Sequence, residues 1–289
     1  MYRGSEGAAP RPPAAAPVAG LTGLVGAMDA PTAEAPSGAV TLAPGQPIQP
    51  ALEEQARAGG GWVILAKGLH TIAAPLRLPS GVTLAGEGKD SILFLDPKQT
   101  GPAIVNAADD LHDVTLRDFV VEGGTAPRPS SDPNQDRRAR SYQNAPSRAG
   151  IVLSGQPAVQ MRNIRLDHLT VRHCTHFGVA IRGAAQVTIM ASDFSDNGGS
   201  VVPGPGLEHN LSLTHVTGAE ITGNRLDDSP WGDGLNVAES SDITVAGNEA
   251  ARNRGNGLRL TDSRNLRVRA NLAEANGRDG VFLDKASRP

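Results

Sequence analysis

The fold of this chain is decided by three segments of its sequence: AEITGN at 219–224, ITVAGN at 243–248 and LRVRAN at 266–271. In each segment apolar residues alternate with other residues, and each segment ends on an asparagine. The asparagines recur 24 and then 23 residues apart, at Asn224, Asn248 and Asn271. A unit of about 23 residues made of short strands and turns is typical of stacked coils and not of a globular sheet.

The repeat can be followed through the C-terminal half of the chain. We expect first strands to begin at Ile151, Val179, Leu211, Leu235, Leu258 and Val281. We expect second strands at Ile164–Leu166, Val187–Ile189, Ala219–Ile221, Ile243–Val245 and Leu266–Val268. Stacked coils hold equivalent positions about 4.8 Å apart. The asparagines then fall in a turn, where their side chains can hydrogen-bond to one another along the stack.

A glycine precedes every first strand except one, where Asn210 takes its place. Glycine and asparagine are the residues that best tolerate a positive φ. The column therefore predicts a turn with positive φ before each first strand.

The composition fits a narrow coiled interior. The chain has 289 residues, 3% aromatic residues, 34 glycines and 22 prolines, whereas a large conventional core uses more aromatic side chains. A formal charge of −3 gives no reason to expect nucleic acid or an acidic membrane as a partner. The single cysteine, Cys174, excludes an internal disulfide framework, and we expect it to be a small buried hydrophobic residue. No apolar run reaches the roughly 18 residues that a membrane helix needs.

Two regions differ in composition. Residues 1–38 are rich in alanine, proline and glycine, which predicts a disordered leader, and residues 39–289 are expected to form one β-helix domain. Within the leader, the mildly apolar stretch Ala14–Met28 is either the remnant of an export signal or plain flexible chain. We expect an exported protein, periplasmic or extracellular. Residues Pro50–Ala58 predict a short helix that stops at a run of three glycines.

The segment that follows this helix carries a family resemblance. Its strands and turns read GGWVIL (60–65), KGLHTI (67–72), LPSGVTL (78–84) and GEG (86–88). In this order they resemble the N-terminal cap and first coils of the pectate-lyase-like proteins of the pectin lyase superfamily, and the similarity of organisation covers residues 45–289. The resemblance implies an all-β fold, a right-handed parallel β-helix with a short N-terminal capping helix. It also implies a broad association with polysaccharides, because that superfamily holds lyases, hydrolases, epimerases and non-enzymatic fibres.

Side chains that can carry chemistry gather at one turn of the repeat. His209 and Asp233 stand two places before the first strands of neighbouring coils, so we expect them to lie one coil apart in an exposed groove. Glu208 adjoins His209, and Asp228 lies in the turn that leads to Asp233. Carboxylates beside a histidine can perform general acid–base catalysis. The predicted catalytic residues are therefore His209, Asp233, Asp228 and Glu208, although Asp and Asn in such turns also cap backbone groups.

Two insertions enter the repeat at the same corner, at 122–149 and 198–208. Long loops on a rigid scaffold commonly shape a binding groove, so we expect both to overhang one flank. Arginines can bind the carboxylates of a substrate bidentately, and a tryptophan offers an apolar face on which sugar rings stack. The predicted substrate-binding residues are Trp231, Arg259, Arg140, Tyr142 and Asn236.

These residues favour a carbohydrate-active enzyme that acts on an acidic polysaccharide as a lyase or an epimerase. His209 or Tyr142 would remove the C5 proton of a uronic acid, and Arg140 or Arg259 would neutralise its carboxylate. One alternative is an inverting glycoside hydrolase that uses Asp228 and Asp233 as its carboxylate pair. Another is a non-catalytic β-helix subunit that binds glycan or has a structural role.

Family motifs that would decide between these activities are missing. The resemblance to polygalacturonases is limited to the first aspartate, in Gly232-Asp233-Gly234, since the next coil has Gly255-Asn256-Gly257 and no Gly-His-Gly follows. The Asp-Pro-His signature of mannuronan epimerases is also absent. We expect no cofactor and no metal site. A calcium site built from Asp227, Asp228 and Asp233 is the alternative, although their spacing matches no specific calcium loop.

The expected partner is a polysaccharide or an oligosaccharide. The chain stops at Asp284–Pro289, directly after a first strand, and an open end exposes unpaired strand edges. We therefore expect either that the chain is a fragment or that an oligomer partner or another chain covers the C-terminal coil.

Overall fold

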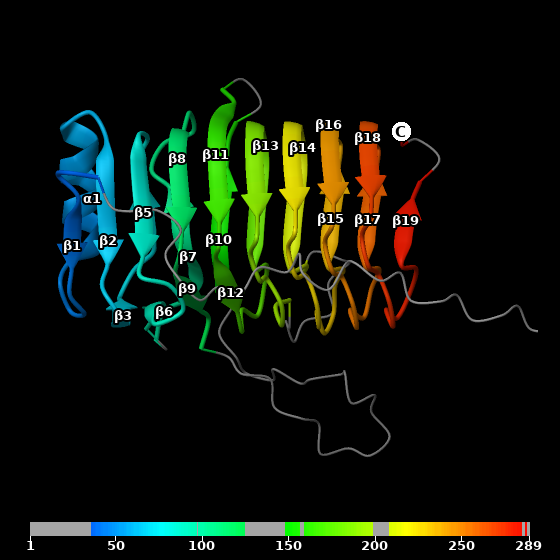
Figure 1. The fold of residues 1–289 in the computed structure, drawn as a ribbon, viewed down its shortest axis with the longest axis horizontal. Coiled ribbons are helices and arrows are strands. Elements are labelled where there is room, and N and C mark those ends of the chain that lie inside the picture. The colour runs from blue at the N-terminus through cyan, green and yellow to red at the C-terminus, as the bar shows by residue number, and fades with distance from the viewer. Residues whose placement is uncertain are drawn as a thin grey trace, which may run out of the picture.

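A computed structural model of the protein describes residues 36–96, 98–124, 148–156, 159–198, 208–284 and Ser287. The described strands wind into one parallel β-helix, with α1 at one end and β19 at the other (Figure 1). Residues 1–35 of the predicted leader lie outside the described residues, as do 125–147 and 199–207 of the two insertions. Arg140 and Tyr142 are therefore outside the described part of the chain. None of the described helices is long and apolar enough to cross a membrane.

The secondary structure is almost entirely strand. Its single described helix is α1 (Ile48–Arg57). The strands are β1 (Val40–Leu42), β2 (Gly61–Leu65), β3 (Gly68–Ile72), β4 (Leu76–Leu78), β5 (Val82–Gly86), β6 (Ser91–Leu95), β7 (Gly101–Asn106), β8 (His112–Arg117), β9 (Val120–Glu122), β10 (Arg148–Ser154), β11 (Met161–Asp167), β12 (Thr170–Arg172), β13 (Val179–Met190), β14 (Leu211–Thr222), β15 (Leu235–Ala238), β16 (Ser241–Ala246), β17 (Leu258–Thr261), β18 (Arg264–Arg269) and β19 (Val281–Leu283).

The predicted capping helix is present and begins two residues early. α1 starts at Ile48, so Pro50 lies in its first turn, where a missing N–H costs no hydrogen bond. Ile48, Ala51 and Leu52 are buried, which closes the N-terminal end of the apolar interior. The helix stops where Gly59 takes a positive φ of 92°.

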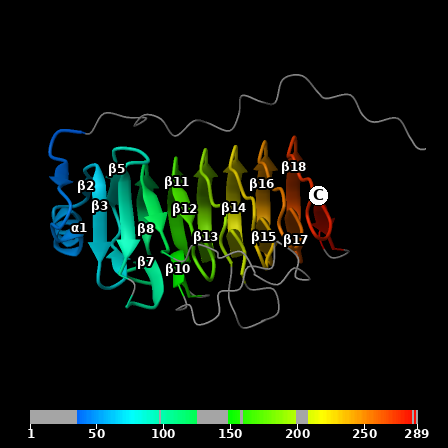
Figure 2. The same cartoon turned by 90° about the horizontal axis from the view of Figure 1, so that it is seen from below.

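The predicted strand register is confirmed. The first strands β10, β13, β14, β15, β17 and β19 pair in parallel through the six residues that were expected to open them. The second-strand positions pair in the same way through β11, β13, β14, β16 and β18. In β13 and β14 the two positions are joined in one strand of 12 residues (Figure 2). Inward positions are aliphatic in coil after coil, so a narrow continuous core runs along the axis.

The asparagine ladder is also confirmed. The Nδ2 of Asn224 donates to Oδ1 of Asn248 at 3.0 Å, and the Nδ2 of Asn248 donates to Oδ1 of Asn271 at 3.0 Å. The same oxygens accept the backbone N–H groups of Asn224 and Asn248 at 2.9 Å. Each side chain thus forms hydrogen bonds with backbone groups of a buried turn. This need explains why asparagine recurs at this position in successive coils.

Two further ladders went unrecognised in the sequence. Asn253 donates through Nδ2 to Oδ1 of Asn276 at 3.1 Å, at the turn that precedes the first strands. At a third turn, the backbone N–H of Ser240 donates to Oγ of Ser263 at 3.1 Å. Every turn of these coils therefore has a stack of polar side chains that pairs buried backbone groups.

The prediction of positive φ for the glycine column is wrong. Neither its glycines nor Asn210 are among the residues with positive φ. These glycines are needed for space: a Cβ at Gly257 would lie 2.6 Å from the carbonyl oxygen of Gly280, and one at Gly150 would collide with that of Gly178. Positive φ occurs in other columns, including His173, Asp196, Asp228, Arg252 and Ala275.

The last described coil exposes apolar side chains. Leu272, Val281 and Leu283 are about half exposed, at 51%, 49% and 45%. That another chain covers this coil stays a prediction.

Candidate functional site

His209 and Asp233 lie on neighbouring coils, as the repeat predicts. The backbone N–H of Asp233 donates to Nδ1 of His209 at 3.0 Å, and Oδ2 of Asp233 lies 3.4 Å from the same nitrogen. A nitrogen that accepts an N–H carries no proton itself, so the neutral ring has its proton on Nε2. In this tautomer Nδ1 serves the backbone, and the ring can donate a proton only from Nε2.

The two residues belong to a backbone-pairing column. The backbone N–H of Asn256 donates to Oδ1 of Asp233 at 2.6 Å, and that of Asp279 donates to Oδ1 of Asn256 at 3.2 Å. Each side chain accepts the N–H of its counterpart one coil later. This arrangement matches the alternative in which the Asp and Asn side chains of these turns cap backbone groups.

The expectation that both residues are exposed is wrong. Only 3% of the His209 side chain and 7% of the Asp233 side chain are accessible. Glu208 is also buried, at 7%. The physical reason is the tight turn, since Gly232 passes so close to this segment that a Cβ at this glycine would collide with the backbone of Glu208 and would lie 3.0 Å from Nδ1 of His209.

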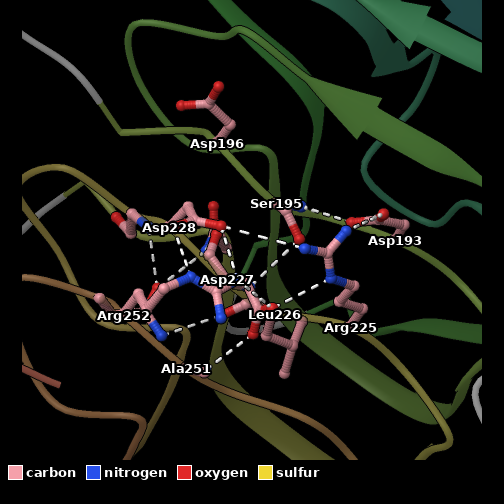
Figure 3. A network of polar contacts seen from close by, with 12 residues as sticks. Asp193, Ser195, Asp196, Arg225, Leu226, Asp227, Asp228, Ala251 and Arg252 are labelled. Atoms are coloured by element: carbon pink, nitrogen blue, oxygen red, sulfur yellow. Dashed lines mark hydrogen bonds and ion pairs between the residues drawn. The ribbon is translucent and has the colours of Figure 1, made fainter. Parts of the chain in front are cut away.

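Asp228 is held in a charge network that spans three coils (Figure 3). Its two oxygens accept hydrogen bonds from Nε and Nη2 of Arg252, at 3.0 and 2.8 Å. The fully buried Asp227 accepts from Nη2 of Arg252 at 2.8 Å, from Nε of Arg225 at 3.0 Å and from the backbone N–H of Ala251 at 2.7 Å. Both carboxylates are therefore engaged in joining coils.

The electrostatics of the network follow from its composition. The hydrogen bonds to Asp228 raise the pKa of Arg252 above its ordinary value, and the nearby Asp227 adds to the effect. Burial lowers the pKa of Arg225, but Asp193 and Asp227 more than offset it, so the pKa is raised. An arginine is charged at neutral pH in any case, and these raised pKa values hold both guanidinium groups in the charged form.

Trp231 stacks on an arginine. The guanidinium carbon of Arg254 lies 3.9 Å from the centroid of the indole ring, which is a cation–π contact. The indole Nε1 is buried and has no hydrogen-bond partner among the residues that the structure describes. One face of the ring is thus covered by protein, and Trp231 is not among the described residues that line the cavity below.

A cavity of about 500 Å³ lies along the outer face of the first strands. Its described lining comprises Val152, Leu153, Ser154, Phe177, Ala180, Ile181, Arg182, His209, Ser212, Thr214, Asn236, Ala238 and Arg259. Three predicted site residues meet here, namely His209, Asn236 and Arg259. The predicted Asp228, Asp233 and Glu208 are not part of this described lining, so the structure does not bring the carboxylates to the cavity.

The floor of the cavity is a hydrogen-bonded row. Nη1 of Arg259 donates to Oδ1 of Asn236 at 3.0 Å, and Nδ2 of Asn236 donates to Oγ of Ser212 at 3.2 Å. One wall is formed by Phe177 and His209, whose ring centroids are 6.1 Å apart. In its described lining the cavity has two arginines and no carboxylate, so its field favours an anion.

Arg182 and Thr214 are lining residues that sequence reasoning missed. They lie in a second outward column, Arg182, Thr214, Ala238 and Thr261, which follows the column of Ala180, Ser212, Asn236 and Arg259 by two places on the same strands. Because side chains of a strand alternate with a period of two, this second outward column could have been found by extending the alternation.

A second polar cluster lies near the starts of both insertions. Nδ1 of His173 lies 2.8 Å from Oε1 of Glu122, and its Nε2 lies 3.5 Å from Oδ2 of Asp196. Burial acts to raise the pKa of Glu122, but the hydrogen bond with His173 and the charge of that ring outweigh it, so the pKa is lowered. The adjacent Cys174 is fully buried, and burial raises the pKa of its thiol. In the described part of the chain, no group of three or more His, Cys, Asp or Glu residues is arranged to hold a metal ion.

Comparison with known proteins agrees with the fold. Residues 204–289 match the family described as a right-handed β-helix region. No curated protein shows significant sequence similarity to the chain.

Similar solved structures share the architecture at low sequence identity. The tailspike protein of Dettilon has a TM-score of 0.58 at 13% identity, over 82% of this chain and 43% of that one. An exopolygalacturonase from Thermotoga maritima has a TM-score of 0.54 at 15% identity, over 86% and 70%. PfbA, a surface adhesin of Streptococcus pneumoniae, has a TM-score of 0.54 at 13% identity, over 77% and 57%. The predicted right-handed parallel β-helix, as in the pectin-lyase-like proteins that the sequence resembles, is confirmed.

Proposed function

We propose that this β-helix protein acts on carbohydrate and binds an acidic polysaccharide along the first strands. The observation that carries the proposal is the described lining of the cavity, which has Arg182 and Arg259 and no carboxylate. Arginine is the side chain best suited to planar recognition of carboxylates. A polymer with a negative group on its sugar units would meet this face favourably.

The remaining lining suits a sugar. Ser212, Thr214 and Asn236 supply hydroxyl and amide groups that can exchange hydrogen bonds with sugar hydroxyls. Phe177 supplies an apolar surface at the wall. An elongated face that crosses several coils suits a polymer better than a compact ligand. The name of the similar Thermotoga maritima enzyme, an exopolygalacturonase, accords with a polysaccharide ligand.

A binding assay tests this proposal directly. Polygalacturonate and alginate are titrated into the protein, with a neutral polysaccharide such as dextran as the control. We expect the acidic polymers to bind and their affinity to fall as salt is added, because the arginine contacts are screened. Equal binding of acidic and neutral polymers would contradict the proposal.

A lyase or epimerase reaction on the bound polymer is the finer candidate. Its support is that His209 lines the same cavity as Arg259. The arginine would neutralise the uronate carboxylate and so make the C5 proton more acidic, and the histidine would exchange a proton with the sugar. In the tautomer described above His209 donates a proton from Nε2, so proton removal by this ring would require Nδ1 to release the backbone N–H of Asp233.

Product analysis separates the chemical alternatives. β-Elimination gives an unsaturated uronate that absorbs ultraviolet light, and epimerisation in D₂O places deuterium at C5. Hydrolysis gives new reducing ends without either signal. A hydrolase needs two carboxylates beside the scissile bond, and the described lining offers none, so we expect no hydrolysis.

An exported location accords with such a ligand, because acidic polysaccharides of this kind are found outside the cytoplasm. We propose a periplasmic or extracellular protein. Fractionation of the producing cells checks this, and recovery of the protein from the cytoplasm alone would contradict it.

A further inference from the structure

We infer that the cavity recognises two separate negative groups of one oligosaccharide, one at Arg182 and one at Arg259. The inference rests on the proposed function and narrows its ligand to an anionic oligomer long enough to span both arginines. A single uronic acid cannot contact both arginines, and neither can an oligomer that is too short to span them.

The separation of the arginines follows from the strand register. Arg182 of β13 pairs with Thr214 of β14, Thr214 with Ala238 of β15, and Ala238 with Thr261 of β17, the strand that carries Arg259. Three coil steps of about 4.8 Å place the two residues about 14 Å apart along the axis. This distance exceeds the length of one sugar ring, so a ligand that reaches both arginines extends along the axis of the β-helix.

The two arginines differ in how they are held. Arg259 is partly buried, and Asn236 accepts a hydrogen bond from its Nη1 at 3.0 Å. Asn236 is itself oriented by its bond to Ser212. Arg182 is exposed and makes no side-chain hydrogen bond or ion pair with the described residues. Arg259 is therefore the preorganised position, and Arg182 loses more side-chain freedom when it binds an anion.

The face between the arginines is neutral. Ser212 and Asn236 occupy the row that leads to Arg259, and Thr214 and Ala238 occupy the row that leads from Arg182. Neither guanidinium has a carboxylate partner among the described residues, so both can take a ligand anion without first breaking an ion pair. The order along the axis is thus cation, neutral polar floor and cation.

Binding of both ends by one molecule predicts a threshold in ligand length. Once the first anion is held at Arg259, the second is presented to Arg182 at a high effective concentration, provided that the chain is long enough. Affinity then rises steeply at that length and changes little beyond it.

Calorimetric titration with oligogalacturonates and oligomannuronates of increasing length tests the inference. We expect weak binding of the shortest acids and a rise of about tenfold or more at the length that spans both arginines. Arg182→Gln removes this rise, so that the longer oligomers bind about as weakly as the shortest acids. Arg259→Gln weakens the binding of all lengths. Arg182→Lys retains the charge without the bidentate fork, and we expect it to restore part of the rise.

Arg267→Gln is the matched control, because Arg267 is an exposed arginine on β18 that is not part of the described lining. It removes the same charge and should leave the threshold in place. Circular dichroism and thermal melting verify that every variant is folded.

The outcomes are distinguishable. If acidic oligomers bind more tightly than neutral cello-oligosaccharides but without a threshold, or if Arg182→Gln leaves the threshold intact, this inference is overturned and the proposed function stands. If acidic oligomers bind no better than the neutral ones, the proposed function fails and the inference fails with it.

Discussion

The backbone N–H of Asp233 donates a 3.0 Å hydrogen bond to Nδ1 of His209, one coil away. The most reactive side chain in the predicted site is therefore also an acceptor for the backbone, in the place where other coils use aspartate or asparagine. Its ring borders the cavity while its Nδ1 holds two coils together. Structural and functional roles of His209 have to be separated by substitution.

His209→Asn and His209→Ala separate them. Alanine leaves the buried N–H of Asp233 unpaired, so we expect it to lower the free energy of unfolding by about 1–3 kcal/mol. Asparagine offers an acceptor, as Asn256 does for Asp279, and should cost less. Urea denaturation measures both values. Equal losses would show that Nδ1 has no role in pairing the backbone. If His209 also takes part in catalysis, both variants lose activity.

Asn248 is the centre of the asparagine ladder. It accepts two hydrogen bonds from Asn224 and donates to Asn271 and to the carbonyl of Ile221. Asn248→Ala leaves several buried groups unpaired, and we expect it to lower the free energy of unfolding by roughly 2–4 kcal/mol. Thr244→Ala, a partly exposed change on the same coil, should stay within about 0.5 kcal/mol of the parent. Chemical denaturation measures both free energies of unfolding. Equal losses for Asn248→Ala and Thr244→Ala would contradict this expectation.

Gly257 tests why glycine precedes the first strands. If glycine is there for space, Gly257→Asn forces the new Cβ against the carbonyl oxygen of Gly280, 2.6 Å away, and costs about 1–3 kcal/mol or more. The control Gly247→Asn has a φ of 64° and no atom within 4 Å of its Cβ. Asparagine tolerates that φ, so its cost should be small. Thermal melting measures both costs. If neither substitution lowered the melting temperature, lack of space would not explain the glycine at position 257.

Arg252 neutralises two carboxylates. Arg252→Gln leaves Asp227 fully buried with one arginine in place of two, and we expect a loss of about 1–3 kcal/mol. Adding Asp228→Asn removes one of the two carboxylate charges that Arg252 had neutralised and should recover part of that loss. Arg267→Gln, on an exposed strand position, is the charge-matched control. A double-mutant cycle by denaturation measures the coupling, and strictly additive effects would contradict the network.

Glu122 makes the stability of the fold depend on pH in the acid range. Its pKa in the folded protein is below its ordinary value of 4.5, so its carboxylate stabilises the fold fully above that value. The contribution is lost as the pH falls through the lowered pKa. We expect Glu122→Gln to flatten the fall in melting temperature in this acid range. An unchanged pH profile would show that the ion pair with His173 contributes nothing.

Much of the fold was readable because a solenoid repeats its constraints. The asparagine spacing predicted the strand register, and every first strand from Ile151 to Val281 pairs as expected. The same spacing predicted that His209 and Asp233 would be neighbours. It also gives Asn236 and Arg259 equivalent positions, directly after Leu235 and Leu258, and both line the cavity.

Other features depend on contacts that the sequence pattern does not express. Whether Asp228 faces a substrate or Arg252 depends on which side chain of the next coil reaches it, and Arg252 engages both of its oxygens. Whether Trp231 offers a free face depends on Arg254, 23 residues later, which covers it. Burial of His209 depends on the close passage of Gly232.

The sequence by itself determined the coil, its register and its asparagine ladder, because each unit must bury the same aliphatic positions and pair the same backbone groups in every turn. The tertiary structure alone decided which polar side chains bond neighbouring coils to one another and which face the cavity. Aspartates and asparagines have the same spacing in both cases, and only the atoms that lie opposite them on the next coil distinguish a backbone cap or an ion pair from a group that can meet a ligand.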